Sequence, residues 1–127
     1  MNIKHNKFSD KLLAEIDKAD DLHIAPLRGD GVSYGTPTWI WEVVVDDCLY
    51  VRAYNGVQSR WYKAAINQKR GRIEAAGKIM DVAFIPASGE VNDTIDEAYK
   101  KKYGGSPYLS SMISNRARAA TIRIVPA

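Results

Sequence analysis

The sequence contains one cysteine, two histidines and no long apolar run, and each shortage excludes a class of protein. The single thiol, Cys48, allows no disulfide within the chain and no cluster of thiolate metal ligands. It follows two carboxylates that disfavour a thiolate, so we expect a buried structural thiol. Only His5 and His23 could supply imidazole, which is too few for a typical metal site, so we predict no metal centre.

Sequence signals for membranes, nucleotides and serine hydrolases are missing as well. No apolar run approaches the roughly 20 residues that a membrane-spanning helix requires, and the polar residues 1–11 lack the apolar stretch of a signal peptide. The chain has no P-loop, no GxGxxG string and no Ser-His-Asp arrangement. We therefore expect a cytoplasmic protein without membrane contact.

The length and composition indicate one globular domain over residues 1–127. The chain has 127 residues, of which 46% are hydrophobic and 26% are charged, which is ordinary for a compact domain. Its net charge of +3 is small. No aromatic residue stands between Arg116, Arg118 and Arg123, so we predict no nucleic-acid binding and interpret these side chains as a solvated basic face.

Helical spacing of apolar residues predicts three helices, at about residues 9–18, 59–70 and 92–103. Ser9 is suited to cap the first helix. Gly71 is suited to end the second as the residue after its last turn. In the third helix, Asp96 and Lys100 stand four residues apart with the acid first, which is the favourable order for an ion pair.

Alternating apolar residues predict about six strands arranged in hairpins, at residues 23–28, 38–45, 48–54, 72–76, 79–85 and 120–125. We expect tight turns at Asp46-Asp47 and at Gly77-Lys78. The hairpin of residues 38–54 carries apolar side chains on both faces, which is typical of a barrel or of a sheet covered on both sides. The chain therefore reads as an α+β protein: an antiparallel β-barrel of about six strands with three peripheral helices.

The segment that follows the second strand of this hairpin is the best candidate for chemistry. It runs from the strand through a glycine turn into the start of a helix, where Ser59 and Arg60 stand. Free N–H groups and the positive end of the helix dipole favour an anion there, and a hydroxyl and a guanidinium suit phosphate. Arg52 could reach the same place from the end of its strand. The alternative is that Ser59 only caps the helix and that Arg60 is only solvated.

The same segment resembles known flavoproteins. Its triplet Ser59-Arg60-Trp61 is similar to the Ser-Arg-Lys-like triplet that grips the FMN phosphate in the pyridoxamine 5′-phosphate oxidase superfamily. Residues 59–65 (SRWYKAA), followed by Gly71, also resemble the deazaflavin-dependent nitroreductase branch. Nearly the whole chain resembles a bacterial domain family of unknown function in the same split-barrel group. That resemblance is carried by residues 21–26 (DLHIAP), 34–39 (YGTPTW), 54–56 (YNG) and 116–119 (RARA).

This resemblance implies an antiparallel split β-barrel that forms a homodimer and binds FMN or a deazaflavin. The function implied is a flavin- or deazaflavin-dependent oxidoreductase acting on an unidentified small molecule. Ser59, Arg60 and Arg52 would hold the phosphate of the cofactor. The aromatic side chains that would shape its ring pocket are Trp39, Tyr54 and Trp61. The cofactor would carry the electron chemistry, and no catalytic residue is identified.

A second hypothesis is a non-catalytic binding or dimeric module that kept the barrel and lost the flavin. Trp61 favours it, because the oxidases have a lysine at this place of the triplet and the exchange removes one phosphate-binding charge. The oxidases also place an arginine one strand earlier, where this chain reads Thr36-Pro37-Thr38-Trp39. The sequence leaves open whether Arg116 and Arg118 meet a ligand, a partner subunit or water.

Overall fold

A computed structural model describes residues 8–19 and 22–127 of the chain. Seven antiparallel strands form one sheet with the order β2-β1-β5-β6-β7-β4-β3. The strands are β1 (Leu22–Pro26), β2 (Thr38–Ile40), β3 (Glu42–Val45), β4 (Cys48–Arg52), β5 (Arg70–Ala75), β6 (Lys78–Pro86) and β7 (Thr121–Pro126). The helices are α1 (Asp10–Lys18), α2 (Arg60–Gln68), α3 (Val91–Tyr103), α4 (Leu109–Met112) and α5 (Asn115–Arg118), with a short 3-10 helix, η1 (Gly56–Gln58).

The sheet curls into a nearly closed barrel, and the chain itself joins its two edges. β2 and β3 lie at opposite ends of the strand order, yet only Trp41 separates them in the sequence. β2 pairs with β1 through Trp39 and His23, whereas β3 pairs with β4 through Val43 and Tyr50. A single continuous segment can serve both edges only if they lie close together, so the sheet is bent round on itself.

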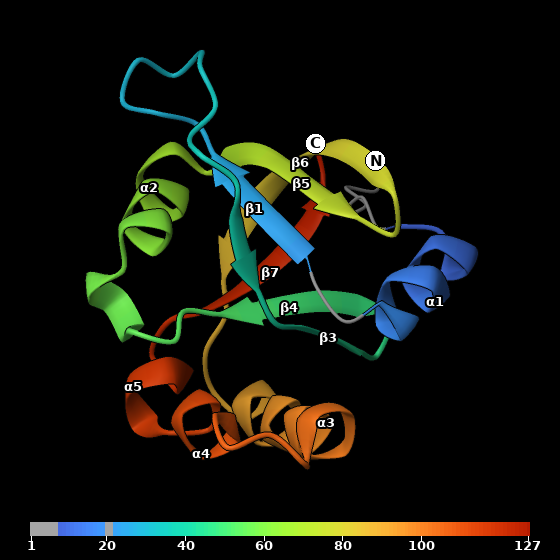
Figure 1. Cartoon of the computed structure of the whole chain (residues 1–127). Coiled ribbons are helices and arrows are strands. Elements are labelled where there is room, and N and C mark those ends of the chain that lie inside the picture. Colours follow the sequence, from blue (N-terminus) through green and yellow to red (C-terminus); the bar gives the residue numbers. More distant parts are fainter. Residues whose placement is uncertain (1–7, 20–21) are drawn as a thin grey trace, which may run out of the picture.

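The helices divide into two groups around the barrel. α1 and α2 lie on opposite sides of it, and α3, α4 and α5 form a layer below β3 and β4 (Figure 1). A first cluster of buried residues fills the barrel and the inner faces of α1 and α2; it includes Leu13, Ile24, Val51, Ile73 and Ile122.

A second cluster lies between the outer face of the β3–β4 hairpin and the α3–α4 layer, and it includes Val43, Val45, Tyr50, Ile95 and Tyr99. Both faces of this hairpin are therefore covered, as its two apolar faces predict.

Two hairpin turns are set by residues that tolerate positive φ. The turn between β3 and β4 holds Asp46 at φ 49° and Asp47 at φ 63°, as predicted. The turn between β5 and β6 lies at Ala76-Gly77, with φ of 52° and 75°, one residue before the predicted position. Two consecutive positive φ values match the right-handed twist of the flanking strands, so the turn takes this frame and Lys78 joins β6.

The α+β barrel prediction is confirmed, but the element count is higher than predicted. The expected strand 38–45 is two strands, because Trp41 leaves the ladder and stacks on Tyr103 of α3 with ring centroids 4.0 Å apart. The layer below the barrel also contains α5, which sequence periodicity did not indicate because the helix has only four residues.

Three local predictions are wrong. α2 ends on Lys69, which takes the left-handed conformation at φ 63°; Gly71 instead lies within β5, where a Cβ atom would come 2.6 Å from the carbonyl oxygen of Ala25. Lys100 pairs with Glu97 rather than with the acid four residues before it. Cys48 is only partly buried, because it stands at the hairpin turn. By contrast, the Ser9 hydroxyl caps α1 as predicted.

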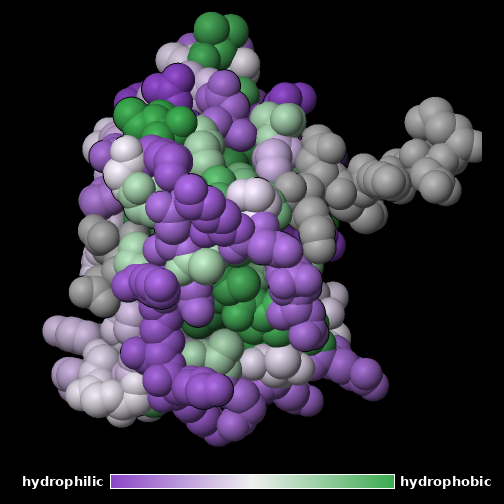
Figure 2. Space-filling view, turned by 90° about the vertical axis from the view of Figure 1, so that its right-hand side faces the viewer, coloured by the Kyte–Doolittle hydropathy of each residue, from purple (hydrophilic) through white to green (hydrophobic). Residues whose placement is uncertain are grey.

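The face that Figure 2 presents is mostly polar, with apolar side chains visible in a hollow. In residues 8–19 and 22–127, no helix combines the length and the apolar character that crossing a membrane requires.

Candidate functional site

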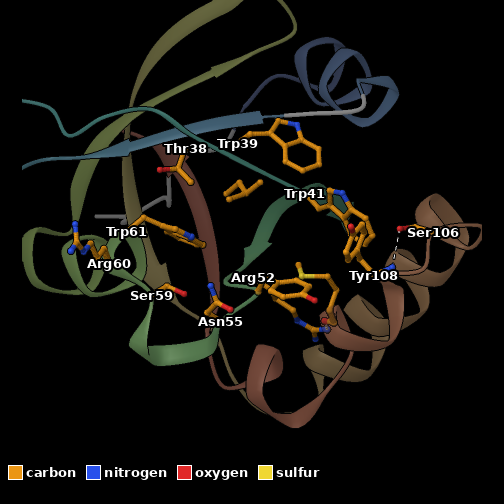
Figure 3. A pocket seen from close by; sticks show the side chains of 13 residues that line it. Thr38, Trp39, Trp41, Arg52, Asn55, Ser59, Arg60, Trp61, Ser106 and Tyr108 are labelled. Atoms are coloured by element: carbon orange, nitrogen blue, oxygen red, sulfur yellow. Dashed lines mark hydrogen bonds between the residues drawn. The ribbon is translucent and has the colours of Figure 1, made fainter.

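A cavity of about 810 Å³ opens between the strand edge at β2, the end of β4, the start of α2 and the α3–α4 connection (Figure 3). Its volume lies in the range of clefts that hold cofactors and drug-sized ligands. It is lined by Thr38, Trp39, Ile40, Trp41, Arg52, Tyr54, Asn55, Ser59, Arg60, Trp61, Ser106, Tyr108 and Met112. The lining thus joins segments that lie up to 74 residues apart, from Thr38 to Met112, and only the closed barrel brings them together.

Aromatic side chains dominate this cavity. The sequence has three tryptophans, and all of them line it together with two tyrosines. Trp39 and Trp61 come from different elements and point into the same space (Figure 3). Trp39 is 53% exposed and Tyr108 is 59% exposed, so much of this aromatic surface faces the mouth of the cavity. Exposed aromatic faces converging on one cleft are suited to stack on a planar ring.

The start of α2 faces the same cavity. Ser59 is its N-cap residue, but the hydroxyl makes no capping bond and points into the cavity (Figure 3). The first N–H groups of the helix, from Arg60 to Tyr62, have no acceptor within a helix of this geometry. This end therefore offers a hydroxyl and several N–H donors to a ligand.

Arg60 contributes less than its position in the sequence indicates. It is exposed, and its guanidinium is turned away from the other labelled side chains (Figure 3). No hydrogen bond or ion pair joins it to another residue in the described part of the chain. Its stem forms part of the rim, whereas its charge points to solvent.

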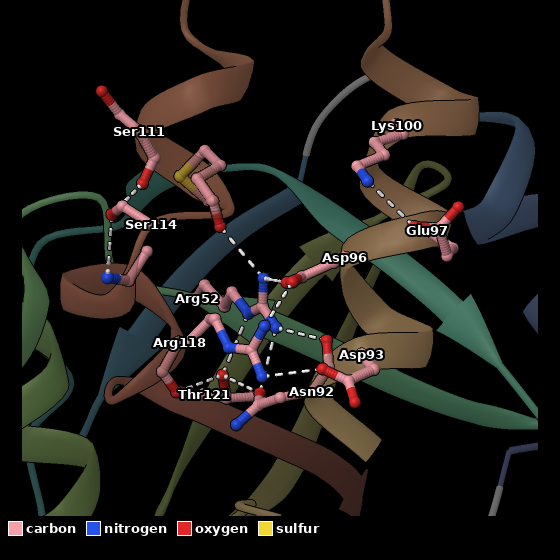
Figure 4. Close-up of polar contacts among 12 residues, drawn as sticks. Arg52, Asn92, Asp93, Asp96, Glu97, Lys100, Ser111, Ser114, Arg118 and Thr121 are labelled. Carbon is pink, nitrogen blue, oxygen red and sulfur yellow. Dashed lines mark hydrogen bonds and ion pairs between the residues drawn. The ribbon is translucent and has the colours of Figure 1, made fainter. Parts of the chain in front are cut away.

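Arg52 lies at the floor of the cavity, where its side chain is fully buried and fully bonded (Figure 4). Its Nη1 donates to Asp96 Oδ1 at 2.5 Å and to the Met112 carbonyl at 3.1 Å. Its Nη2 donates to the carbonyl and the side-chain oxygen of Asn92, and Nε donates to the Thr121 hydroxyl at 3.0 Å. A guanidinium has five N–H donors, and all five are used. Arg52 therefore has no donor left for the phosphate that the sequence prediction gave it.

Asp96 joins Arg52 to a second arginine. Its other carboxylate oxygen accepts a hydrogen bond of 2.6 Å from Arg118, which also pairs with Asp93 at 2.9 Å. We call the group of Arg52, Asn92, Asp96, Arg118 and Thr121 the arginine cluster. It ties α3 and α5 to the ends of β4 and β7, and so fixes the floor of the cavity.

The partners of the two C-terminal arginines are thus protein groups. Arg118 belongs to the arginine cluster. Arg116 donates from Nε to the Tyr54 carbonyl at 3.0 Å, and its guanidinium lies 5.6 Å from the centre of the Tyr54 ring. This contact holds one aromatic wall of the cavity in place. The interpretation of a merely solvated basic face is therefore wrong for these two side chains.

A second buried charge stands beside the cavity. Glu42 is fully buried and forms an ion pair with Lys102 of α3. Nearby, Tyr99 is also fully buried, and this burial raises the pKa of its hydroxyl far above the ordinary value, although the Arg52 charge opposes the shift. Neither side chain lines the cavity.

The structure brings all six predicted site residues to one cavity: Trp39, Arg52, Tyr54, Ser59, Arg60 and Trp61. Seven other lining residues were not predicted. Thr38, Ile40, Trp41 and Asn55 stand within two residues of predicted ones in the sequence. The other three, Ser106, Tyr108 and Met112, come from the α3–α4 connection and from α4. The only signal for them was an aromatic residue in a Gly-Gly-Ser-Pro-Tyr turn, and such a turn reads as a loop unless its position against the barrel is known.

The lining limits the chemistry that the cavity can perform. Within residues 8–19 and 22–127, no aspartate, glutamate, histidine, lysine or cysteine belongs to it. The described residues also contain no group of three or more His, Cys, Asp or Glu side chains that could hold a metal ion. Proton transfer by a side chain would fall to a tyrosine, so redox chemistry here would have to come from a bound cofactor.

Two solved structures share this fold. One, from Listeria innocua, is described as a "Putative Pyridoxamine 5'-phosphate oxidase"; it has a TM-score of 0.64 and 13% sequence identity, over 92% of this chain and 91% of that one. The other is a conserved hypothetical protein of Mycobacterium tuberculosis with a TM-score of 0.61 and 12% identity, over 98% of this chain and 82% of that one. At this identity the likeness shows the fold alone.

Sequence comparison identifies the family of the chain. No curated protein matches the chain. A family model described as "Uncharacterized protein conserved in bacteria (DUF2255)" matches residues 12–124, which is most of the sequence. The chain, a nearly closed antiparallel barrel with an aromatic cavity at the start of α2, therefore belongs to the bacterial family DUF2255.

Proposed function

We propose that this cavity binds the ring system of a flavin or deazaflavin and that the protein is an oxidoreductase acting on an unidentified small molecule. The observation that carries the proposal is the gathering of all three tryptophans around one cleft of about 810 Å³ at a helix N-terminus. A planar tricyclic ring stacks on such walls, and the polar tail of the ligand reaches the helix end.

The residues present suit the ring better than they suit the phosphate. Trp39 and Trp61 would flank the ring, and Tyr54 would close one side. The Ser59 hydroxyl and the first N–H groups of α2 would meet the tail. Arg60 would join them only after its side chain rotates. When bound, the flavin would supply the electron chemistry, and the protein would orient it and exclude water.

The test is a fluorescence and absorbance titration of the purified protein with riboflavin and with FMN. Binding should quench tryptophan emission and shift the visible flavin bands, because the ring lies against the indoles. Trp39→Ala is the matched variant, since it removes one wall without touching a buried side chain. The absence of binding by either flavin, or equal binding by the variant, would contradict the proposal.

The lining favours a second candidate, a binding module without chemistry. No acidic, histidine, lysine or cysteine side chain faces the cavity. The two functions differ in what happens after binding. An oxidoreductase predicts that the bound flavin loses its visible absorbance when NADH or NADPH is added without oxygen. A module predicts that the absorbance stays unchanged.

We also propose that two copies of the chain associate over the mouth of this cavity. The exposed aromatic groups of its lining are Trp39, Tyr54 and Tyr108, each more than 40% exposed. Burying them against a second copy would stabilise the pair by removing apolar surface from water. Analytical ultracentrifugation should give a dimer whose dissociation constant rises in Tyr108→Ser; a monomer at all concentrations would contradict it.

A further inference from the structure

Trp61 occupies the place in the cavity from which a side chain could most directly neutralise an anion. It is the second residue of α2, two residues after Ser59, and its indole points into the cavity (Figure 3). A positive side chain here would add its charge to the N–H groups of the helix end. An indole adds a stacking face and one N–H donor, and no charge.

The other positive side chains at the cavity do not replace that charge. Arg52 is fully buried, with all its donors bonded and its charge compensated by Asp96. Arg60 is turned to solvent, where water and salt screen it. Arg116 is held on the Tyr54 carbonyl, outside the lining. Among the described residues, the interior thus presents aromatic faces, hydroxyls and an amide, and the unpaired guanidinium of Arg60 is turned from it to solvent.

We propose that Trp61 makes this a ring-selective pocket, which binds the flavin ring and distinguishes little between its phosphorylated and unphosphorylated forms. The ligand class is a planar aromatic heterocycle with a neutral or weakly anionic tail. This inference rests on the proposed flavin-binding function and adds a specificity-determining residue to it. The phosphate of FMN meets only helix N–H groups and a hydroxyl, and it loses part of its hydration in exchange.

The experiment compares riboflavin with FMN, which differ only in the phosphate. In the natural protein we expect dissociation constants within about threefold of each other, because no cation inside the cavity is free to pair with the phosphate of FMN. The FMN constant should also change less than about threefold between about 0.05 M and 0.5 M salt, since screening weakens only charge-dependent binding. This salt series needs no variant, so the inference can be tested even if substitutions impair folding.

Trp61→Lys tests the residue directly. It removes one stacking face from both ligands and gives a cation to FMN alone. The preference for FMN over riboflavin should therefore rise from near one to about tenfold, the effect of one charge-assisted hydrogen bond. Trp39→Lys is the matched control, because it makes the same exchange on the β2 wall, across the cavity from α2. Its preference should stay within about threefold of one.

The outcomes separate this inference from the function on which it rests. FMN binding at least about tenfold tighter than riboflavin to the natural protein would overturn the ring-selective pocket and leave flavin binding intact. An unchanged preference in a folded Trp61→Lys protein would overturn the role of Trp61. If riboflavin, FMN and the bare ring lumichrome all fail to bind, both proposals are wrong.

Discussion

Arg52 lies between two regions of unlike chemistry. Below it, the arginine cluster contains two guanidinium groups, one shared carboxylate, an amide and a hydroxyl. Every N–H donor of Arg52 is used by this cluster and by the Met112 carbonyl. Above it, the cavity holds aromatic faces, the Ser59 hydroxyl, which makes no capping hydrogen bond, and a helix end whose first N–H groups have no acceptor in the helix.

The difference teaches which polar groups are available for function. Arginine is the residue type best suited to bind phosphate, and Arg52 stands at the end of β4 that meets the cavity. Yet its charge is already compensated by the carboxylate of Asp96, and a buried network whose hydrogen bonds are all satisfied has no donor to offer a ligand. In this protein, the groups left open are the aromatic rings and the helix end. Function therefore follows from unsatisfied groups rather than from the most suggestive residue type.

The largest expected effect breaks the cluster. Arg52→Met leaves Asn92, Thr121 and a shared carboxylate buried without their main donor, so the free energy of unfolding should fall by about 3 to 5 kcal/mol. Urea unfolding measures it. Arg116→Met is the control, because Arg116 is exposed and contacts the Tyr54 carbonyl and ring at the surface, so it should cost less than about 1 kcal/mol. Equal costs for the two variants would show that the cluster is not special.

A second variant affects only the cavity. Trp39 is 53% exposed, so Trp39→Ala should leave the free energy of unfolding within about 0.5 kcal/mol of the natural value. The same substitution removes a stacking face, and flavin should bind about three to ten times more weakly. Thermal unfolding and fluorescence titration measure the two quantities. A large loss of stability with unchanged affinity would place Trp39 in the structural region instead.

The smallest expected effect concerns a charge that is well bonded but exposed. Hydrogen bonds from the Ser33 hydroxyl and from the N–H groups of Val32 and Ser33 lower the pKa of Asp30 from 3.8 to about 2. Because the folded pKa lies below the ordinary value, the stabilising contribution of Asp30 is complete above about pH 4 and is lost as the pH falls toward 2. We expect only a local opening of this turn, since nothing buried depends on it.

An NMR titration of the Asp30 carboxyl measures this pKa. Ser33→Ala removes the largest cause, so its midpoint should move up toward 3.8. An unchanged midpoint would assign the shift to the backbone donors alone. Together with Arg52→Met, the result would separate the effect of burial from the effect of hydrogen bonding.

Much of the fold could be predicted because its signals are local. The Ser9 cap and the turn at Asp46-Asp47 act within a few residues of the chain. Two of the errors occur where a distant contact decides. Trp41 leaves its strand for Tyr103, and Gly71 lies in a strand because its neighbours leave no room for a Cβ atom.

The candidate site divides in the same way. Residues 52–61 are continuous in sequence, so the strand end and the helix start could be placed together from the pattern alone. The third wall could not, because Ser106, Tyr108 and Met112 reach the cavity through the packing of α3 and α4 on β3 and β4. The same packing decided that Arg52 serves Asp96 rather than a ligand.

The sequence by itself determined the class of this protein: where the main helices and strands lie, that both faces of one hairpin are covered, and that one helix begins with a hydroxyl and an arginine. Tertiary structure alone decided how these groups are used. Whether a charge is free or compensated depends on partners far along the chain. Local spacing and residue type do not show which of these distant residues will lie beside it in the fold.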